Sequence, residues 1–223
     1  FSNEVLLLLN ANDDVITDVH MSIDKQSIFY TSESHRKDII SIDWQGQETV
    51  LPKLNSTLIE GRAQYSATNT DIYFASDRTG STELYQYNVN SQKVEQLTRI
   101  QANTIWHYSL SHNSDKLAIV YSAETIQLAI VDVKTGQLIR SIELEEIKFP
   151  LAWSKDGKSI YVSEHRSQIA MHLYDAETLA IEQKQQHLGL SAVEVENKEI
   201  IAFDYTRDQF VHYSFNDKTA KPI

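Results

Sequence analysis

The chain has 223 residues, a formal net charge of −11 and no cysteine. This length fits one large all-β domain or two small ones, and a chain of this size buries roughly 70% of its unfolded surface, so it needs no covalent staple. The composition excludes disulfides and thiolate metal sites, the acidic balance argues against a general affinity for nucleic acid or anionic lipid, and no apolar run reaches the roughly 20 residues of a membrane span.

Short segments of alternating apolar residues follow one another along the chain, and clusters of Asp, Ser, Asn and Gly separate them. Such alternation predicts strands, and the clusters predict turns. After an apolar segment at residues 4–10, five similar groups follow, each opening with a strand that ends in a polar turn. Second strands are expected at 27–32, 71–76, 116–122, 159–164 and 199–204, third strands at 38–43, 83–88, 127–133, 171–176 and 210–215, and fourth strands at 48–52, 94–98, 138–144 and 179–185.

The groups form a repeat with a period of 40–45 residues, measured between Ile28, Ile72, Leu117, Ile160 and Ile200. A period in the forties is typical of propeller blades. The composition of residues 176–187 also permits a helix, but the register of the repeat favours a strand there. The fifth copy reaches the chain end without a fourth strand, so we expect residues 4–10 to supply it and close the ring, which leaves no unpaired sheet edge.

The sequence thus predicts an all-β fold, a β-propeller of about five four-stranded antiparallel blades in a single domain over residues 1–223. The blades are expected at 14–54, 60–100, 104–146, 148–187 and 189–223, the last completed by 4–10. The alternatives are a fragment of a larger ring and an open ring completed by another chain.

Two of the copies carry a recognisable motif. Residues 76–80 read Ser-Asp-Arg-Thr-Gly, followed by Leu-Tyr at 84–85 and Leu-Thr at 97–98, and residues 153–158 read Trp-Ser-Lys-Asp-Gly-Lys. These residues resemble the TolB-like propeller repeat, with Lys155 where that family has Pro. Gly80 and Gly157 suit turn positions with positive φ. The resemblance implies the fold but leaves the function open, because propellers host unrelated activities.

Candidate binding residues lie where the first strands begin, on the face that a propeller shares with its loops between second and third strands. Counting back from the Ser that ends each first strand predicts that Asp18, Arg62 and His107 converge at the mouth of the central channel, with His20 beside them. Trp106, just ahead of an inner strand, either stacks on a sugar or peptide or packs at the rim.

Arginine is concentrated in the same loops. Four of the seven Arg residues, Arg36, Arg78, Arg166 and Arg207, occupy four of the five loops between second and third strands. Guanidinium groups recognise carboxylates and other anions bidentately, which predicts an anion-binding face. The alternative is that each Arg pairs with a nearby acid such as Asp77, Glu164 or Asp208 and ties blades together.

Catalytic motifs are not found in the sequence. There is no H-E-x-x-H and no G-x-S-x-G, so we expect no metal, no cofactor and no enzyme activity. Two minor alternatives remain: a metal site from His20 and His107, and a glycan-active enzyme, which needs two or three channel carboxylates where the sequence offers Asp18.

The resemblance implies an extracytoplasmic setting. TolB-like repeats occur in periplasmic scaffolding proteins and in the extracytoplasmic part of membrane-anchored transcriptional regulators of the ToxR/CadC type. The chain begins at Phe1 without Met, so we expect a domain excised from a longer protein. We therefore predict a periplasmic or otherwise extracytoplasmic sensor domain, which in a regulator of this type would be tethered to the inner membrane by an upstream anchor. It would bind a protein, peptide or small molecule at the channel face, without contacting nucleic acid or inserting into the membrane itself. A TolB-like scaffold is the alternative.

Overall fold

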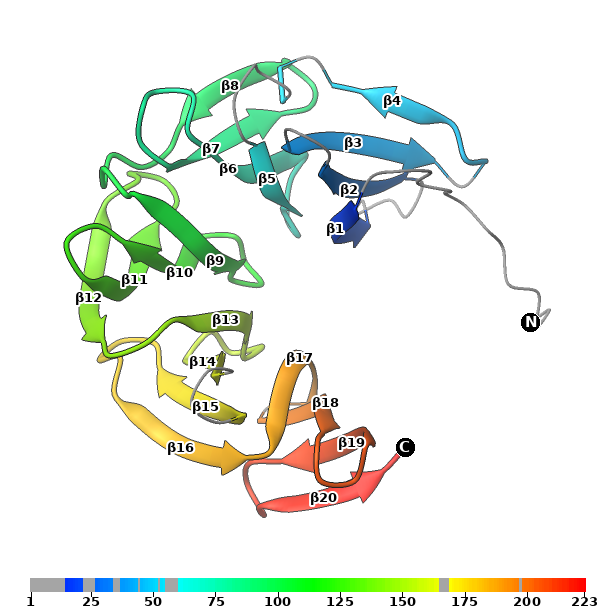
Figure 1. Cartoon of the computed structure of the whole chain (residues 1–223), viewed down its shortest axis with the longest axis vertical. Coiled ribbons are helices and arrows are strands. Elements are labelled where there is room, and N and C mark those ends of the chain that lie inside the picture. Colours follow the sequence, from blue (N-terminus) through cyan, green and yellow to red (C-terminus); the bar gives the residue numbers. More distant parts are fainter. Residues whose placement is uncertain are drawn as a thin grey trace. The chain divides into compact units, whose positions relative to one another are not determined.

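A computed structural model describes residues 15–21, 27–33, 37–43, 45–51, 53–54, 60–164, 169–196 and 198–223 (Figure 1). These residues form strands and turns, and no helix among them is long and apolar enough to cross a membrane. The chain divides into two compact units, residues 1–100 and 101–223.

The N-terminal unit holds two sheets, each with its four antiparallel strands in chain order. They are β1 (Val15–Met21), β2 (Ser27–Glu33), β3 (Lys37–Asp43) and β4 (Glu48–Val50), then β5 (Glu60–Tyr65), β6 (Asp71–Ser76), β7 (Glu83–Asn88) and β8 (Lys93–Gln96). The first strands β1 and β5 contact each other. A core that includes Phe29, Ile39 and Phe74 packs the two sheets together.

The C-terminal unit holds three sheets of the same kind. They are β9 (Thr104–Leu110), β10 (Lys116–Ser122), β11 (Ile126–Asp132) and β12 (Leu138–Leu144); β13 (Lys148–Trp153), β14 (Ser159–Glu164), β15 (Ala170–Asp175) and β16 (Ile181–Gln186); and β17 (Leu188–Glu196), β18 (Glu199–Asp204), β19 (Gln209–Ser214) and β20 (Thr219–Pro222). The first strands β9, β13 and β17 contact in sequence. One apolar cluster, around Trp153, joins the first two sheets, and another, around Tyr161 and Phe215, joins the last two.

The fold class is confirmed: the protein is all-β, with five four-stranded antiparallel blades of a β-propeller. Residues 181–186 form β16, which agrees with the strand prediction over the helix. One detail is corrected, because the fifth copy has its own fourth strand: β20 pairs with β19 through Val211–Pro222 to Ser214–Thr219. A four-residue strand that ends in Pro carries almost no alternation, so the sequence pattern misses it. Residues 4–10, to which we gave that place, lie outside the described residues.

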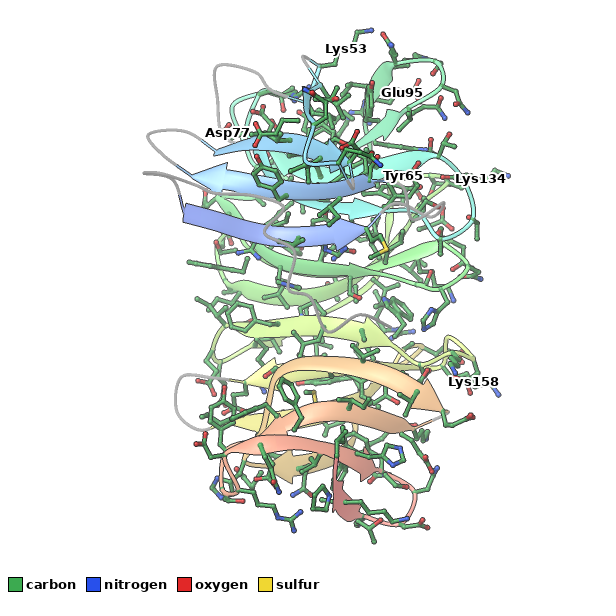
Figure 2. All side chains as sticks on the ribbon, turned by 90° about the vertical axis from the view of Figure 1, so that its right-hand side faces the viewer. Lys53, Tyr65, Asp77, Glu95, Lys134 and Lys158 are labelled. Carbon is green, nitrogen blue, oxygen red and sulfur yellow. The ribbon has the colours of Figure 1, made fainter. Side chains whose placement is uncertain are left out.

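Repeated polar residues fix the turns. In the third and fourth blades the Ser that ends the first strand, Ser111 or Ser154, accepts a backbone hydrogen bond at its hydroxyl from the start of the second strand. Gly80 and Gly157 have φ of 93° and 69°, as predicted. At the turn between the third and fourth strands, Asp132 and Asp175 each accept hydrogen bonds from the backbone N–H and the hydroxyl of a Thr three residues later. Two of these turns, at residues 132–137 and 154–159, lie at the end of the C-terminal blades where Figure 2 labels Lys134 and Lys158.

Every first strand contains a β-bulge. In β5 the pairing shifts between Gly61 and Gln64, and Arg62 adopts φ of 57°. In β1 the shift falls between Thr17 and His20. A bulge inserts one residue and interrupts the inward–outward alternation of a strand. The predicted convergence of Asp18 and Arg62 comes from counting back from the Ser at the end of each first strand, which assumes strict alternation. Both residues lie within these bulges, where the alternation is interrupted.

The last blade buries only one of its faces. Every residue of β14 is buried, whereas β18 alternates between buried and half-buried residues. On that less covered face, Val193 and Phe210 are 64% and 52% exposed, although both are large apolar residues. The apolar residues Val19 and Met21 of β1 are similarly exposed.

Candidate functional site

The start of a first strand meets the end of the second strand at one corner of each blade. Glu60 pairs with Ser76 in the second blade, Lys148 with Glu164 in the fourth, and Leu188 with Asp204 in the fifth. The loop to the third strand begins here, and it carries the predicted Arg residues. We call these three positions the corners of the blades, since they place charged side chains beside the candidate loops.

At the corner of the second blade, Arg78 has a structural role. Its Nη2 lies 3.2 Å from Oε1 of Glu60, whose side chain is fully buried. Its Nε donates to the hydroxyl of Ser76 at 3.1 Å, and its Nη1 donates to the carbonyl of Lys53 at 3.2 Å. The guanidinium also lies 5.0 Å from the ring centres of both Phe74 and Tyr85. This Arg therefore pairs with an acid, as one alternative predicts, but the acid is Glu60 rather than Asp77.

At the corner of the fifth blade, Arg207 is held much more loosely. Its Nε lies 3.6 Å from Oδ2 of Asp204, and its Nη1 donates to the carbonyl of Ala220 at 3.4 Å. The side chain is 46% exposed, against 19% for Arg78. Leu188 stands where the second blade has Glu60, so the buried acid that fixes Arg78 has no counterpart here.

Arg207 lines a hollow of about 230 Å³ between β16 and the outer strands of the fifth blade. The residues that line it are Gln185, Gln186, His187, Leu188, Asp204, Thr206, Arg207, Tyr213, Lys218 and Ala220. On one side the hydroxyl of Tyr213 donates to Gln185 at 2.7 Å. The hollow is mostly polar and joins two blades of one unit.

The one carboxylate of this hollow is already engaged. Oδ1 of Asp204 accepts hydrogen bonds from the backbone N–H and the hydroxyl of Thr206 and from the N–H of Arg207. Burial alone raises the pKa of the Asp204 carboxyl, but these hydrogen bonds and the charge of Arg207 bring it below its usual value. Asp204 is therefore ionised at neutral pH, and Arg207 and Lys218 together leave the lining with one excess positive charge.

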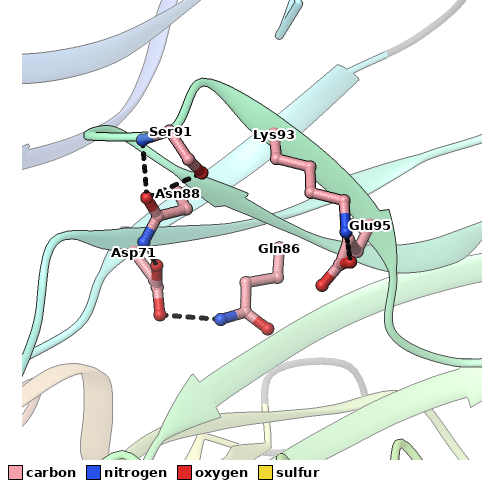
Figure 3. Close-up of a pocket in the computed structure, with 6 residues that line it drawn as sticks. All are labelled: Asp71, Gln86, Asn88, Ser91, Lys93 and Glu95. Atoms are coloured by element: carbon pink, nitrogen blue, oxygen red, sulfur yellow. Dashed lines mark hydrogen bonds and ion pairs between the residues drawn. The ribbon is translucent and has the colours of Figure 1, made fainter.

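A second hollow, of about 250 Å³, lies on the second blade (Figure 3). Its deepest group is the carboxylate of Asp71, which accepts 2.7 Å hydrogen bonds from the side-chain amides of Gln86 and Asn88. At its rim Lys93 forms an ion pair with Glu95. Asp71 is thus held by two amides and Lys93 is paired with Glu95, so the hollow has no unpaired cation among its lining residues and is a weaker anion site than the hollow at Arg207.

The corner of the fourth blade holds a buried charge cluster. Oε2 of Glu164 lies 2.7 Å from Nε2 of His172, 3.7 Å from Nζ of Lys148 and 3.6 Å from Nζ of Lys184, one partner from each other strand of the blade. Burial, aided by the charge of Lys148, lowers the pKa of His172 below 6.5 despite its hydrogen bond to Glu164. This imidazole is therefore neutral at pH 7, and it serves packing and hydrogen bonding within the blade.

The predicted aromatic and histidine candidates of the C-terminal unit join first strands. Nδ1 of His107 lies 3.0 Å from the carbonyl of Pro150 in the next blade, and its ring meets Phe149 edge to face. Trp106, the extra residue of the β9 bulge, packs against the apolar cluster around Trp153. Its indole N–H is buried and has no hydrogen-bond partner among the described residues. Both side chains pack between neighbouring first strands, and their role in binding stays a prediction.

The remaining predicted residues are divided between the units. His20 is half-buried in β1 and Arg62 half-buried in β5, both in the N-terminal unit with Asp18, while His107 belongs to the C-terminal unit. Their convergence at a channel mouth stays a prediction. The side chain of Asp18 and all of Arg36 and Arg166 lie outside the described residues. Among the described residues, no three His, Asp or Glu side chains form a group that could hold a metal ion.

Sequence reasoning missed two residues near the predicted arginines: Glu60, which pairs with Arg78, and Lys218, which lines the same hollow as Arg207. Glu60 precedes Gly61 at the start of an inner strand, where Gly in a strand signals a bulge and close approach. Lys218 lies in the turn before β20, which the sequence pattern did not predict. Knowledge of that strand would have placed Lys218 beside the loop of Arg207.

Comparisons with known proteins support the fold. No protein-family model and no curated protein matches the sequence. Among solved structures, TolB from Acinetobacter baumannii matches with a TM-score of 0.73 at 16% identity, over 96% of this chain and 55% of that one. The β-propeller domain of the Trilobed protease from Pyrococcus furiosus, reported to have an open velcro topology, matches with a TM-score of 0.65 at 13% identity, over 95% and 72%.

An acylaminoacyl peptidase from Pyrococcus horikoshii matches with a TM-score of 0.67 at 13% identity, over 94% of this chain and 39% of that one. At such identities the likeness establishes the fold alone. The class of protein is therefore a β-propeller. More particularly, the fold is TolB-like, and the chain spans just over half the length of the TolB structure that it matches.

Proposed function

We propose that this chain is a non-enzymatic propeller that binds a protein, peptide or small molecule, and that it serves as the extracytoplasmic sensor domain of a membrane-anchored transcriptional regulator. The observation that carries the proposal is how the charged side chains at the blade corners are paired. Glu60 neutralises Arg78, and Glu164 is enclosed by His172 and two lysines. Carboxylates held in this way stabilise blades and are not poised for proton transfer, which supports a binding role over a catalytic one.

The sensor role and the periplasmic location rest on the resemblance to TolB-like repeats and on the TolB-like fold. A propeller suits a sensor because its loops can vary while the blades keep their core. Rigid blades also hold those loops in a fixed geometry, so the scaffold is already folded when a ligand binds.

The test uses the full-length protein in its own cells. Residues 1–223 are replaced in frame by an unrelated periplasmic domain, and transcripts are compared at equal protein level. We expect a defined set of transcripts to lose its response, and we expect protease added to spheroplasts, but not to intact cells, to digest the native domain. Unchanged transcripts, or a domain that is protected in spheroplasts, would contradict the proposal.

A periplasmic scaffold is the second candidate, and the match to TolB over 96% of this chain favours it. A scaffold predicts a different result in the same strains: transcripts stay unchanged while cross-linking through the domain captures envelope proteins. Peptidase propellers also match, so an accessory role beside an enzyme is a further reading of the same fold.

A further inference from the structure

The corner arginines of the second and fifth blades occupy corresponding loops but differ in their surroundings. The guanidinium of Arg78 donates three hydrogen bonds, one of them to a buried carboxylate, and lies near two aromatic rings. Arg207 has contacts of 3.4 and 3.6 Å from two of its nitrogens, and its Nη2 has no partner among the described residues. A guanidinium that is charged, half-exposed and incompletely paired is available to a ligand.

The charge of the hollow at Arg207 is opposite to that of the whole chain. Its lining has one net positive charge, from Arg207 and Lys218 against Asp204, on a chain of formal charge −11. Lys218 is exposed and has no ion-pair partner among the described residues. Asp204 carries a single negative charge and therefore cannot neutralise both cations, and its Oδ1 is already occupied by hydrogen bonds from Thr206. A local reversal of sign concentrates anions at that position.

From this geometry we propose that the hollow between β16 and the fifth blade binds a carboxylate group, with Arg207 as the fork and Lys218 as a second cation. One excess positive charge matches a monoanionic carboxylate better than a dianionic phosphate. The volume of about 230 Å³ lies below the roughly 300–1,000 Å³ of sites that enclose whole drug-sized ligands. The hollow therefore accepts one small acid or the acidic end of a peptide. The proposal rests on the proposed binding function and names the ligand chemistry.

The test is a titration of the ¹⁵N-labelled chain, residues 1–223, followed by backbone amide shifts at constant ionic strength. The probes are propionate, acetylated triglycine with a free carboxyl end, the same peptide amidated, and inorganic phosphate. We expect saturable shifts at Thr206, Arg207 and Ala220 with the carboxylates and none with the amide. If propionate binds more tightly, the source is a free small acid; if the free-acid peptide binds more tightly, the source is a peptide end.

Matched variants make the test local. Arg207→Gln should weaken carboxylate binding about tenfold or more, because it removes a charge-assisted hydrogen-bond donor pair, and Lys218→Gln should weaken it by a smaller factor. Arg140→Gln is the control, since Arg140 is exposed in β12 and the variant has the same net charge as Arg207→Gln. Dispersed spectra that overlay the parent outside the hollow verify the fold of each variant.

The proposal is overturned if no carboxylate gives saturable shifts, if the amidated peptide binds equally well, if phosphate binds more tightly than both acids, or if Arg207→Gln binds like Arg140→Gln. The outcome is separable from that of the proposed function. No saturable carboxylate binding to the parent chain, together with a transcriptional response that is lost on domain replacement, would refute the inference alone. Carboxylate binding with no transcriptional effect of domain replacement would refute the sensor role alone.

Discussion

Replacing Arg78 by Met should destabilise the N-terminal unit by about 3 kcal/mol. The substitution leaves the carboxylate of Glu60, whose side chain is fully buried, without its guanidinium. Removing one partner of a buried ion pair costs about 3–5 kcal/mol, and we take the lower end because Arg78 itself is 19% exposed. The two cation–π contacts add about 0.5–1 kcal/mol each, which Met partly replaces by contact with the same rings.

Native-state hydrogen exchange in β6 measures this change within the unit. A loss of about 3 kcal/mol raises the opening constant roughly 150-fold. Arg207→Met is the matched control, and its exposed pair with Asp204 predicts a change of about 0.5 kcal/mol or less in β18. In a double-mutant cycle, Glu60→Gln combined with Arg78→Met should cost at least about 1 kcal/mol less than the sum of the single changes. A loss below about 1 kcal/mol for Arg78→Met, or additive effects, would refute the buried-pair account.

Three further changes test the fold. The pKa of His172 lies below 6.5 in the folded chain, so at low pH the unfolded chain binds a proton that the folded chain does not. The free energy of unfolding should therefore fall as the pH drops below about 6.5. Urea titrations at pH 7.5 and 5.5 should show a smaller fall for His172→Gln than for the parent chain, and an equal fall would contradict this. Ile200→Ala, at a fully buried site, should cost about 2–5 kcal/mol, whereas Phe210→Ala should cost about 1 kcal/mol or less; equal losses in urea unfolding would contradict the one-sided burial of the last blade. Gly157→Ala should lower stability by about 1 kcal/mol through its φ of 69° alone, since a Cβ there meets open space, and a rise in the melting temperature would show that the strain argument fails.

The sequence predicts the blades well because each blade is a local object. Each blade consists of three consecutive hairpins, and its alternation and turn residues recur every 40–45 residues. Ser154, Gly157 and Asp175 shape turns within a few residues of their own positions. Such short-range hydrogen bonds can be predicted from the residue types at a turn. The exception is β20, whose four residues have too little alternation to register, and the strand was consequently sought at the other end of the chain.

The candidate site was predictable only as a set of loops. Side-chain directions depend on the bulges of the first strands, which alternation does not reveal, although Gly61, Pro150 and Gly189 mark three of them. The partners of each Arg depend on contacts across a blade. Glu60 lies 18 residues before Arg78, and no spacing rule connects them. The sequence thus predicts that Arg78 and Arg207 lie between second and third strands, but it does not predict which groups they contact.

The corners explain how one repeat yields different chemistry in different blades. The backbone places a first-strand residue opposite the end of the second strand in each case, but the residue there is Glu60, Lys148 or Leu188. The acid Glu60 at this position pairs with the loop Arg. Lys148 at this position lies instead beside an acid at the end of the second strand. An apolar Leu188 leaves Asp204 to its own turn and leaves Arg207 incompletely paired. Leu188→Glu, the change that copies the second blade into the fifth, should therefore abolish carboxylate binding while Arg207 itself is retained, and binding that survives this change would show that the first-strand residue does not control the Arg.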